Sequence, residues 1–348
     1  MLSVFTVDDH KQWDKIVTSF EKHDVYYLNA YVKAFQLHGD GQPHLVYFDN
    51  GKTRAMNVVM KRDIAECDHF AGKIPTRTWY DLSTPYGYGG FIIEGDDCDE
   101  LNTEYTRYCF DNNIVSEFVR FHPVLRNANR LSELYDVSEL GETVHIDLHN
   151  ADSIWDNFTG KNRNVIRKAK KLGVEIYWGR SPKLFSQFKE MYNQTMDGQG
   201  ANSYYYFEDA FYDSILNDLR NNAMIFYATH EERIIAMAII LFCNGQMHYH
   251  LSGSDWDYRN YAATNLLLYE VALWGNANGF KTLHLGGGLG SKGDSLYRFK
   301  KAFNRTFSNT FAIGKKCFNK EVYDTLVGIR EEEMGFDSGT SFFPLYRA

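Results

Sequence analysis

The sequence lacks the patterns that mark several common classes of protein. Its five cysteines form no CxxC pair, which excludes a disulfide framework and a zinc knuckle: Cys67, Cys98, Cys109, Cys243 and Cys317. The longest apolar run, Ile234 to Cys243, is too short to cross a bilayer. The start, MLSVFTVDDHKQWDK, has no basic segment followed by an apolar one. We therefore expect a soluble, unexported protein in a reducing cytosol.

Catalytic signatures are also scarce. No Ser-His-Asp pattern or nucleophile elbow is present, so we expect no covalent enzyme intermediate. His248 and His250 share one face of an expected strand, which is a spacing that metal pairs use. No carboxylate or cysteine is placed to complete such a site. We expect no metal and interpret both imidazoles as buried and hydrogen-bonded.

The composition is that of a globular protein with a full core. Of the 348 residues, 44% are hydrophobic and 24% are charged, and the length is sufficient for two domains. The aromatic share of 16% suggests that some rings line a cleft. The net charge of −8 argues against a surface that binds nucleic acid throughout, but it allows a local basic patch.

The two halves of the chain share one pattern. HLVYFDNGKTRAMNVVMKR (44–62) and MIFYATHEERIIAMAIILF (224–242) align without a gap, and each reads as strand, turn and strand. In each half a helix then runs into a strand, at 105–123 and 265–287. This repetition predicts a duplicated α/β unit.

The secondary structure of the second half can be predicted more clearly than that of the first. We expect strands at 224–229, 234–242, 247–253 and 281–285, with a helix from about 264 before the last one. A meander that feeds a crossover helix and another strand predicts a mixed sheet with helices packed on it. This order resembles the GNAT acyltransferase fold.

A glycine-rich stretch, HLGGGLGSKGDSLYRFKKAFN, runs from His284 to Asn304. Its residues 288–293 match GxGxxG by letter, but they do not follow the first strand of a βαβ unit, and Lys292 lacks the context of a Walker A lysine. Two interpretations remain. The stretch is a flexible loop, or its glycines let a large substrate approach the backbone beside the cations that follow.

A second basic element is KNRNVIRKAKKLGVEI (161–176). Apolar residues recur in it at helical spacing, which predicts an amphipathic helix ended by Gly173 with a cationic outer face. Such a face is ordinarily only solvated. In an acidic protein, it also suits a diphosphate or an RNA backbone.

Two aromatic segments also have two interpretations. DLSTPYGYGGF (81–91) reads as a shaped turn carrying Tyr86 and Tyr88, and SYYYFEDAF (203–211) carries three tyrosines. Each segment is structural, or it offers rings and hydroxyls to a polar ligand.

Together, the blocks TPYGYGG, KNRNVIRKAKKLGV, HYHLSGSDWDYRNYAATNLLLYEVALWGNANGFKTLHLGGG and DSLYRFKKAF resemble the Fem family (FemABX), the nonribosomal peptidyltransferases of bacterial peptidoglycan synthesis. The resemblance implies an α/β (α+β) protein of two tandem GNAT-like domains with mixed sheets flanked by helices. We expect domain 1 at 1–145, with 315–348 packing back on it, and domain 2 at 146–314. Residues 173–224 are too few to hold the coiled-coil arm of some members.

The resemblance also implies an activity and its partners. The expected reaction transfers an aminoacyl group from aminoacyl-tRNA to the side-chain amine of a UDP-linked or lipid-linked muropeptide, in the bacterial cytoplasm and in peripheral proximity to the membrane. No cofactor is expected beyond these co-substrates.

The family's Phe-Lys pair falls on Phe299 and Lys300. A fixed ammonium there would stabilise the negative charge that builds on the carbonyl oxygen when an amine attacks an ester. Asp81 is a candidate base. The expected substrate-binding residues are Arg163, Arg167, Tyr86, Tyr88, Asp81, Tyr205 and Arg298.

The GNAT likeness raises a competing donor, acetyl-CoA or another acyl-CoA. Its pyrophosphate loop, Arg/Gln-x-x-Gly-x-Gly/Ala, would fall on residues 259–264, RNYAAT. The arginine is kept, but alanine replaces glycine, which weakens close approach of a pyrophosphate. The alternative function is an acyl-CoA-dependent N-acyltransferase for a sugar, amine or peptide of the cell envelope, and a non-enzymatic scaffold is a third reading. The donor-binding candidates are Arg259, Ala263, Thr264 and Lys301.

Overall fold

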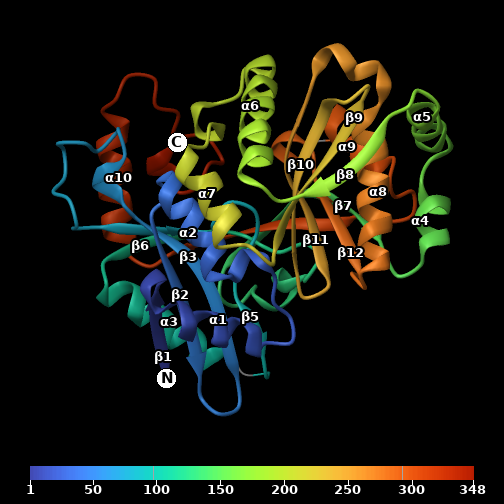
Figure 1. The fold of residues 1–348 in the computed structure, drawn as a ribbon. Helices are drawn as coiled ribbons and strands as arrows, with labels where there is room; N and C mark the ends of the chain where they lie inside the picture. Colours follow the sequence, from blue (N-terminus) through green and yellow to red (C-terminus); the bar gives the residue numbers. More distant parts are fainter. Residues whose placement is uncertain (97, 292) are drawn as a thin grey trace. The chain divides into compact units, whose positions relative to one another are not determined.

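The computed structural model describes residues 1–96, 98–291 and 293–348 (Figure 1). The chain divides into two compact units, one of Met1–Leu140 with Phe311–Ala348 and one of Gly141–Thr310. The boundaries expected from the sequence, after residues 145 and 314, lie a few residues further along the chain. Lys292 of the GxGxxG match lies outside the described residues.

The first unit contains a mixed sheet in the order β1-β2-β3-β4-β6-β13, with β5 paired to β3. The strands are β1 (Leu2–Thr6), β2 (Gln42–Asp49), β3 (Arg54–Asp63), β4 (Tyr80–Ser83), β5 (Ile92–Glu94), β6 (Ile114–Arg120) and β13 (Asn309–Cys317). The helices are α1 (His10–Ser19), α2 (Asn29–His38), α3 (Asp99–Asp111) and α10 (Lys320–Glu331). The 3₁₀ helices are η1 (Val7–Asp9), η2 (Val25–Tyr27), η3 (Ile64–Glu66), η4 (Asn127–Arg130) and η8 (Leu345–Arg347).

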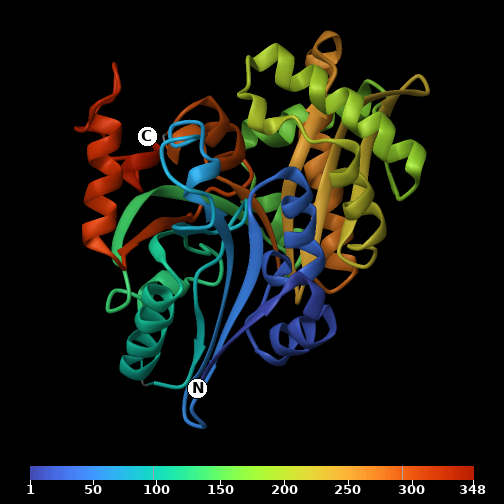
Figure 2. The ribbon, with the colours of Figure 1, turned by 90° about the vertical axis from the view of Figure 1, so that its left-hand side faces the viewer.

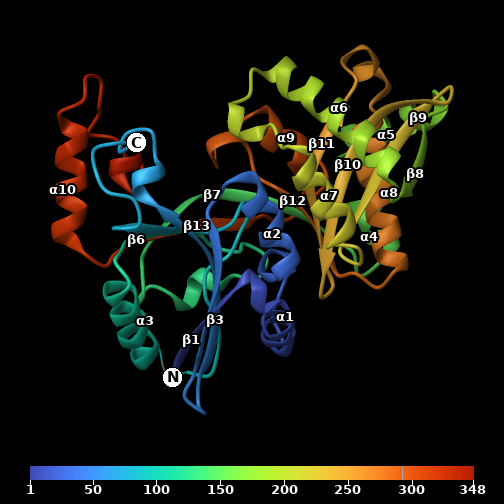
Figure 3. The same cartoon turned by 60° about the vertical axis from the view of Figure 1, so that its left-hand side comes forward.

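Strand alternation places the core of the first unit. Val46 and Phe48 of β2 point to the face that α3 covers, where they pack with Leu101 and Tyr105. Figures 2 and 3 show α3 on this face and α1 and α2 on the other. The late strand β13 joins this unit because it pairs antiparallel with β6, and Gly314 fits there since a Cβ would lie 2.6 Å from the Phe121 ring.

The second unit contains a mixed sheet in the order β7-β12-β11-β10-β9-β8, and among the described residues only the pairing of β11 with β12 in this sheet is parallel. The strands are β7 (Asp136–Asp147), β8 (Glu175–Gly179), β9 (Ala223–His230), β10 (Arg233–Cys243), β11 (Gln246–Ser254) and β12 (Thr282–Gly286). The helices are α4 (Ala151–Asn157), α5 (Gly160–Lys171), α6 (Pro182–Gln199), α7 (Asp209–Asn217), α8 (Ala263–Ala277) and α9 (Ser295–Lys301). The 3₁₀ helices are η5 (Ser203–Tyr205), η6 (Trp256–Tyr261) and η7 (Leu289–Ser291).

These bounds confirm the meander, the crossover helix and the strand after it that the sequence predicts. They also confirm the amphipathic helix at α5, which begins after the N-cap Thr159, and the absence of a coiled-coil arm, because the chain between α5 and β9 folds as β8, α6, η5 and α7. Among the described residues, no helix combines the length and the apolar character needed to span a bilayer.

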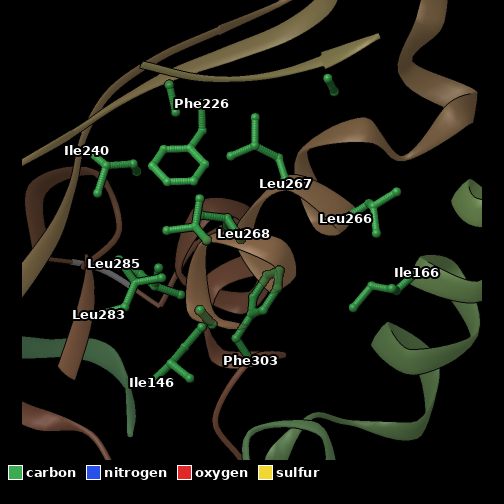
Figure 4. Packing of buried hydrophobic residues seen from close by; sticks show 14 of the residues in the cluster. Ile146, Ile166, Phe226, Ile240, Leu266, Leu267, Leu268, Leu283, Leu285 and Phe303 are labelled. Carbon is green, nitrogen blue, oxygen red and sulfur yellow. The ribbon is translucent and has the colours of Figure 1, made fainter. Parts of the chain in front are cut away.

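The main core of the second unit lies between the sheet and α8. This helix is apolar around most of its circumference because it packs on the strands with one side and on α5 with another. Figure 4 shows Leu267 and Leu268 beside Phe226 of β9, while Leu266 points toward Ile166 of α5. Helix α6 covers the opposite face of the sheet over β10 and β11 (Figure 1).

Candidate active site

The sheet of the second unit opens between β11 and β12. The two strands pair only over Gln246–His248 and Thr282–His284, and in the described chain no strand pairs with this edge of β11 after His248. The register between β10 and β11 also shifts here, so that His250 is an extra residue that forms a β-bulge. Burial and His248 lower the pKa of His250 to about 3. The expectation that these histidines hold no metal stays a prediction.

The glycine-rich stretch follows β12 at this opening. Gly287 lies against β7, where an added Cβ would be 2.8 Å from the carbonyl oxygen of Glu142. Asp294 then caps α9, because its carboxylate accepts from the N–H of Tyr297 at 2.8 Å and from that of Leu289 at 2.9 Å. The loop is therefore tied at both ends. Close backbone packing explains the glycine at 287.

Lys300 lies in the last turn of α9, with only 9% of the residue exposed. Its Nζ donates to the carbonyl oxygen of Gly287 at 2.7 Å, which is its one hydrogen-bond partner among the described residues. Burial lowers the pKa of Lys300 from 10.5 to about 8, against the opposing attraction of Asp294. An ammonium has three N–H donors, so two remain for a ligand.

The neighbours of Lys300 anchor α9. Phe299 packs against the core, and its ring meets that of Phe303 edge-on at 5.5 Å. Lys301 donates to the carbonyl oxygen of Phe307 at 3.0 Å, and Arg298 is exposed and donates to that of Gly293 at 3.2 Å. Local contacts therefore engage Lys301, whereas Arg298 still presents its guanidinium to solvent.

Two asparagines that the sequence reading missed hold α5, α8 and α9 together. Asn162 is 2% exposed, accepts from Nδ2 of Asn265 at 2.9 Å, and donates to the carbonyl oxygen of Ala302 at 3.4 Å. The sequence could have indicated the role of Asn162, because this residue lies at helical spacing on the same buried face of α5 as Ile166 and Ala169. A buried amide in an apolar stripe indicates a polar partner.

The cations of α5 differ in their surroundings. Arg167 is exposed, with its guanidinium 5.1 Å above the Trp155 ring, and Arg163 is half-buried and reaches the carbonyl oxygen of Asp156 at 3.4 Å. Lys170 pairs with Glu270 at 2.8 Å. The remaining cations of this helix are exposed: Lys161, Lys168 and Lys171. The basic face is therefore still largely available to anions.

The expected donor loop precedes α8. Ala262 adopts φ +54, a left-handed conformation that glycine takes without strain, and in the described chain no side chain caps the N-terminus of α8. Arg259 donates to the carbonyl oxygen of Trp256 and stacks 4.7 Å above that ring. The first amides of α8, at Ala263 and Thr264, thus have a geometry that suits an anion.

In the first unit, the predicted turn around Tyr86 and Tyr88 is present. Tyr86 stacks on Phe35 at 5.4 Å, and Arg120 donates to the carbonyl oxygens of the loop, including that of Pro85 at 2.7 Å. Burial raises the pKa of Tyr88 far above its ordinary range. The contacts give this turn a structural role. Tyr205 of the second unit is 36% exposed, with its ring edge-on to another tyrosine.

Asp81 requires a correction. It is fully buried, and its carboxylate accepts from Arg62 at 2.7 Å, from Arg347 and from the hydroxyl of Tyr346. Burial alone would raise the pKa of Asp81, but the two guanidinium groups hold it below 3.8. A buried carboxylate that is paired in this way cannot bind substrate or accept a proton at neutral pH, so the sequence-based assignment was wrong.

The structure thus groups nine of the thirteen predicted residues around three elements of the second unit, whereas Tyr86, Tyr88, Asp81 and Tyr205 lie elsewhere. Phe299, Lys300, Arg298 and Lys301 lie on α9, Arg163 and Arg167 on α5, and Arg259, Ala263 and Thr264 before and within the first turn of α8. The hydrogen bonds of the buried Asn162 to Asn265 and to Ala302 connect these three helices. The arrangement joins a buried ammonium, an open basic face and an uncapped helix N-terminus within one unit.

Comparison with known proteins identifies the fold. Residues 157–301, which make up most of the second unit, match the acetyltransferase (GNAT) domain family. The crystal structure of FemX is similar over 93% of this chain and 99% of that one, with a TM-score of 0.66 at 14% identity. L-PGS from Bacillus licheniformis is similar over 92% and 96%, with a TM-score of 0.57 at 14% identity. A comparison with curated protein sequences gave no match.

A third similar structure is the C-terminal domain of a putative lysylphosphatidylglycerol synthetase from Agrobacterium fabrum, with a TM-score of 0.56 at 13% identity, covering 92% of this chain and 96% of that one. These likenesses confirm the mixed α/β fold of GNAT type that the sequence predicts, and the family match confirms the expectation of an acyltransferase.

Proposed function

We propose that this chain is an aminoacyltransferase of the Fem type, which transfers an aminoacyl group from aminoacyl-tRNA to the side-chain amine of a peptidoglycan-precursor peptide. The observation that carries the proposal is Lys300, a buried ammonium fixed on Gly287 beside the opening between β11 and β12. The similarity of the fold to FemX supports it.

In this proposal, Lys300 is the hydrogen-bond donor to the developing oxyanion. The acceptor amine attacks the ester carbonyl, a C–N bond forms, and negative charge builds on the carbonyl oxygen until the ester C–O bond breaks. The proton lost by the amine ends on the hydroxyl of the tRNA that leaves. With a pKa of about 8, Lys300 is still mostly protonated at pH 7, so it can donate to that oxygen.

In this proposal, the basic face of α5 binds the phosphate groups of the substrates. Arg163 and Arg167 lie on a helix whose start is tied to the end of α9 through Asn162, so phosphates bound there are held relative to Lys300. The RNA backbone of the donor and the diphosphate of a UDP-linked or lipid-linked precursor share this chemistry. We infer that the reaction takes place in the bacterial cytoplasm, near the membrane for a lipid-linked acceptor.

A second candidate is an acyl-CoA-dependent N-acyltransferase, and the N-terminus of α8 favours it. The left-handed backbone at Ala262 keeps the loop shape that a glycine would give, and the uncapped amides of α8 suit a pyrophosphate. The match to an acetyltransferase domain family points the same way. The methyl group of Ala262 and the RNA-compatible basic face of α5 favour the tRNA donor.

Two transfer assays on the purified protein separate the candidates. One combines charged tRNAs with a UDP-linked muropeptide, and the other combines acetyl-CoA with a panel of amines, peptides and amino sugars. We expect product in the first assay and its loss with Lys300→Met. Product from acetyl-CoA alone, with saturable CoA binding and no response to charged tRNA, would establish the second candidate and refute the first.

A further inference from the structure

A groove of about 840 Å³ lies within the second unit, between α6 and the outer strands β8, β9 and β10. Its size is that of a ligand site, and its wall mixes charged and polar side chains with apolar ones. It is separate from the residues on α5, α8 and α9 discussed above. The lining residues that matter here are Glu175, Tyr177, Glu190, Tyr227, Glu232 and Arg233.

Uncompensated negative charge distinguishes this groove. Arg233 donates to Asp255 at 2.7 Å, so these two lining charges neutralise each other. Among the described residues, no cation pairs with Glu175, Glu190 or Glu232, and all three are exposed. Lys183 is the remaining lining cation. The groove therefore favours a cationic ligand.

A pair of tyrosines forms part of the floor. Tyr177 of β8 and Tyr227 of β9 occupy paired positions, and their rings stack with centroids 5.8 Å apart. Tyr177 is 45% exposed, and its hydroxyl donates to Glu175 at 3.0 Å. An exposed aromatic face beside a carboxylate binds an ammonium or a guanidinium through both groups.

The turn that carries Glu232 has an unfavourable conformation. His230 pairs with Arg233, so Glu231 and Glu232 form a two-residue turn with φ +48 and φ +63. Asn-Gly is the usual solution for such a turn, because larger residues resist positive φ. The corresponding turn of the first unit contains Asn50-Gly51. Glu232 therefore places a negative charge at the rim of the groove although its positive φ is unfavourable for a residue with a side chain.

We propose that this groove binds a basic peptide segment in extended conformation, with lysine or arginine side chains over Tyr177 and among the three carboxylates. The length supports a peptide over a small cation. Lining residues on α6 run from Lys183 to Gln194, which spans about 16 Å of helix. That length matches about five extended residues. The proposal does not rest on the function proposed above.

The test measures binding of fluorescein-labelled hexapeptides to the full chain by fluorescence anisotropy at low salt. One probe carries three lysines, and its control carries three glutamates in the same positions. We expect saturable binding of the lysine peptide that weakens as salt is raised, and none of the glutamate peptide. Equal binding of both peptides, or of neither, overturns the proposal.

Neighbouring residues of the turn provide matched variants. Glu232→Gln should weaken the lysine peptide about threefold, and Glu175→Gln with Glu190→Gln about tenfold, because these carboxylates face the ligand. Glu231→Gln, on the same turn but outside the lining, should leave the affinity within about twofold. Tyr177→Phe should bind better than Tyr177→Ala.

If Glu231→Gln and Glu232→Gln weaken peptide binding equally, the peptide responds only to the overall charge of the protein. This result would overturn the assignment of the peptide site to this groove. Spermidine serves as the competitor that decides ligand class. Displacement of the peptide by an equal concentration of spermidine would overturn the peptide proposal in favour of a small polyamine.

Discussion

Replacing Lys300 by methionine should make the protein more stable at neutral pH and almost inactive. The native pKa is about 8, whereas the unfolded chain titrates near 10.5. Below both values, the protonated side chain therefore costs about 3 kcal/mol of folding free energy. Methionine has a similar volume and no charge, but it leaves the carbonyl oxygen of Gly287 without its donor, which costs about 1 to 2 kcal/mol. We expect a net gain of about 1 to 2 kcal/mol at pH 7.

The pH dependence gives the sharper readout. Between pH 8 and 10.5 the unfolded chain binds more protons at residue 300 than the native chain, so this group makes the wild type more stable as pH rises. Its cost falls from about 3 kcal/mol at pH 7 to about 1 kcal/mol at pH 9.5. The methionine variant lacks this change, and its advantage should shrink by about 2 kcal/mol over that interval.

Urea unfolding of both proteins at pH 7 and pH 9.5 measures these differences, since all other titrations are common to the two chains. Turnover with the preferred donor should fall by about 10²-fold or more in the variant, as it does when an oxyanion donor is removed. Identical pH slopes for the two chains would refute the argument that Lys300 is a buried ammonium with a lowered pKa.

Three further outcomes are expected. Arg163→Ala with Arg167→Ala should weaken binding of charged tRNA and flatten its salt dependence, measured by filter binding, whereas Lys320→Ala on the first unit should change neither. Ala262→Gly should relieve the left-handed backbone and strengthen CoA binding in calorimetry if α8 holds a pyrophosphate; unchanged affinity argues against that donor. Asp81→Asn should destabilise the fold by about 3 to 5 kcal/mol at pH 7. Since the pKa of Asp81 is lowered, its contribution is present above pH 3.8 and is lost as acid protonates it, so the wild type and Asp81→Asn should converge in stability only in strong acid.

The fold of the second unit could be read from the sequence because its signals are local. The strands β9, β10 and β11 alternate with turns at Glu231-Glu232 and Asn244-Gly245, and α8 follows as a long apolar helix. The same holds for α5, where apolar spacing and Gly173 set the face and the end of the helix. The resemblance pointed to the residues of α9, and the structure adds that Lys300 is buried.

The features that the sequence did not predict depend on contacts between residues that lie far apart in the chain. Asp81 stands in a turn-rich segment that looks exposed, but Arg347, 266 residues later, closes over it. Position 287 requires glycine because a carbonyl oxygen of β7 packs against it, and no local sequence pattern predicts this contact. The groove beside α6 could not be predicted for a related reason. In the sequence, Glu231 and Glu232 look like ordinary solvent-exposed turn residues, and only the structure shows that α6 lies opposite Glu232 across a groove.

The division of the chain into units has a consequence for its synthesis. Gly141–Thr310 is one continuous stretch, so the ribosome delivers the whole second unit before the last strand of the first. Strand β13 and Arg347 arrive afterwards, and only then can β6 gain its antiparallel neighbour and Asp81 its second guanidinium. The N-terminal unit, although it emerges first, is therefore completed last, and its unfinished sheet edge is exposed to chaperones and to neighbouring nascent chains while translation continues.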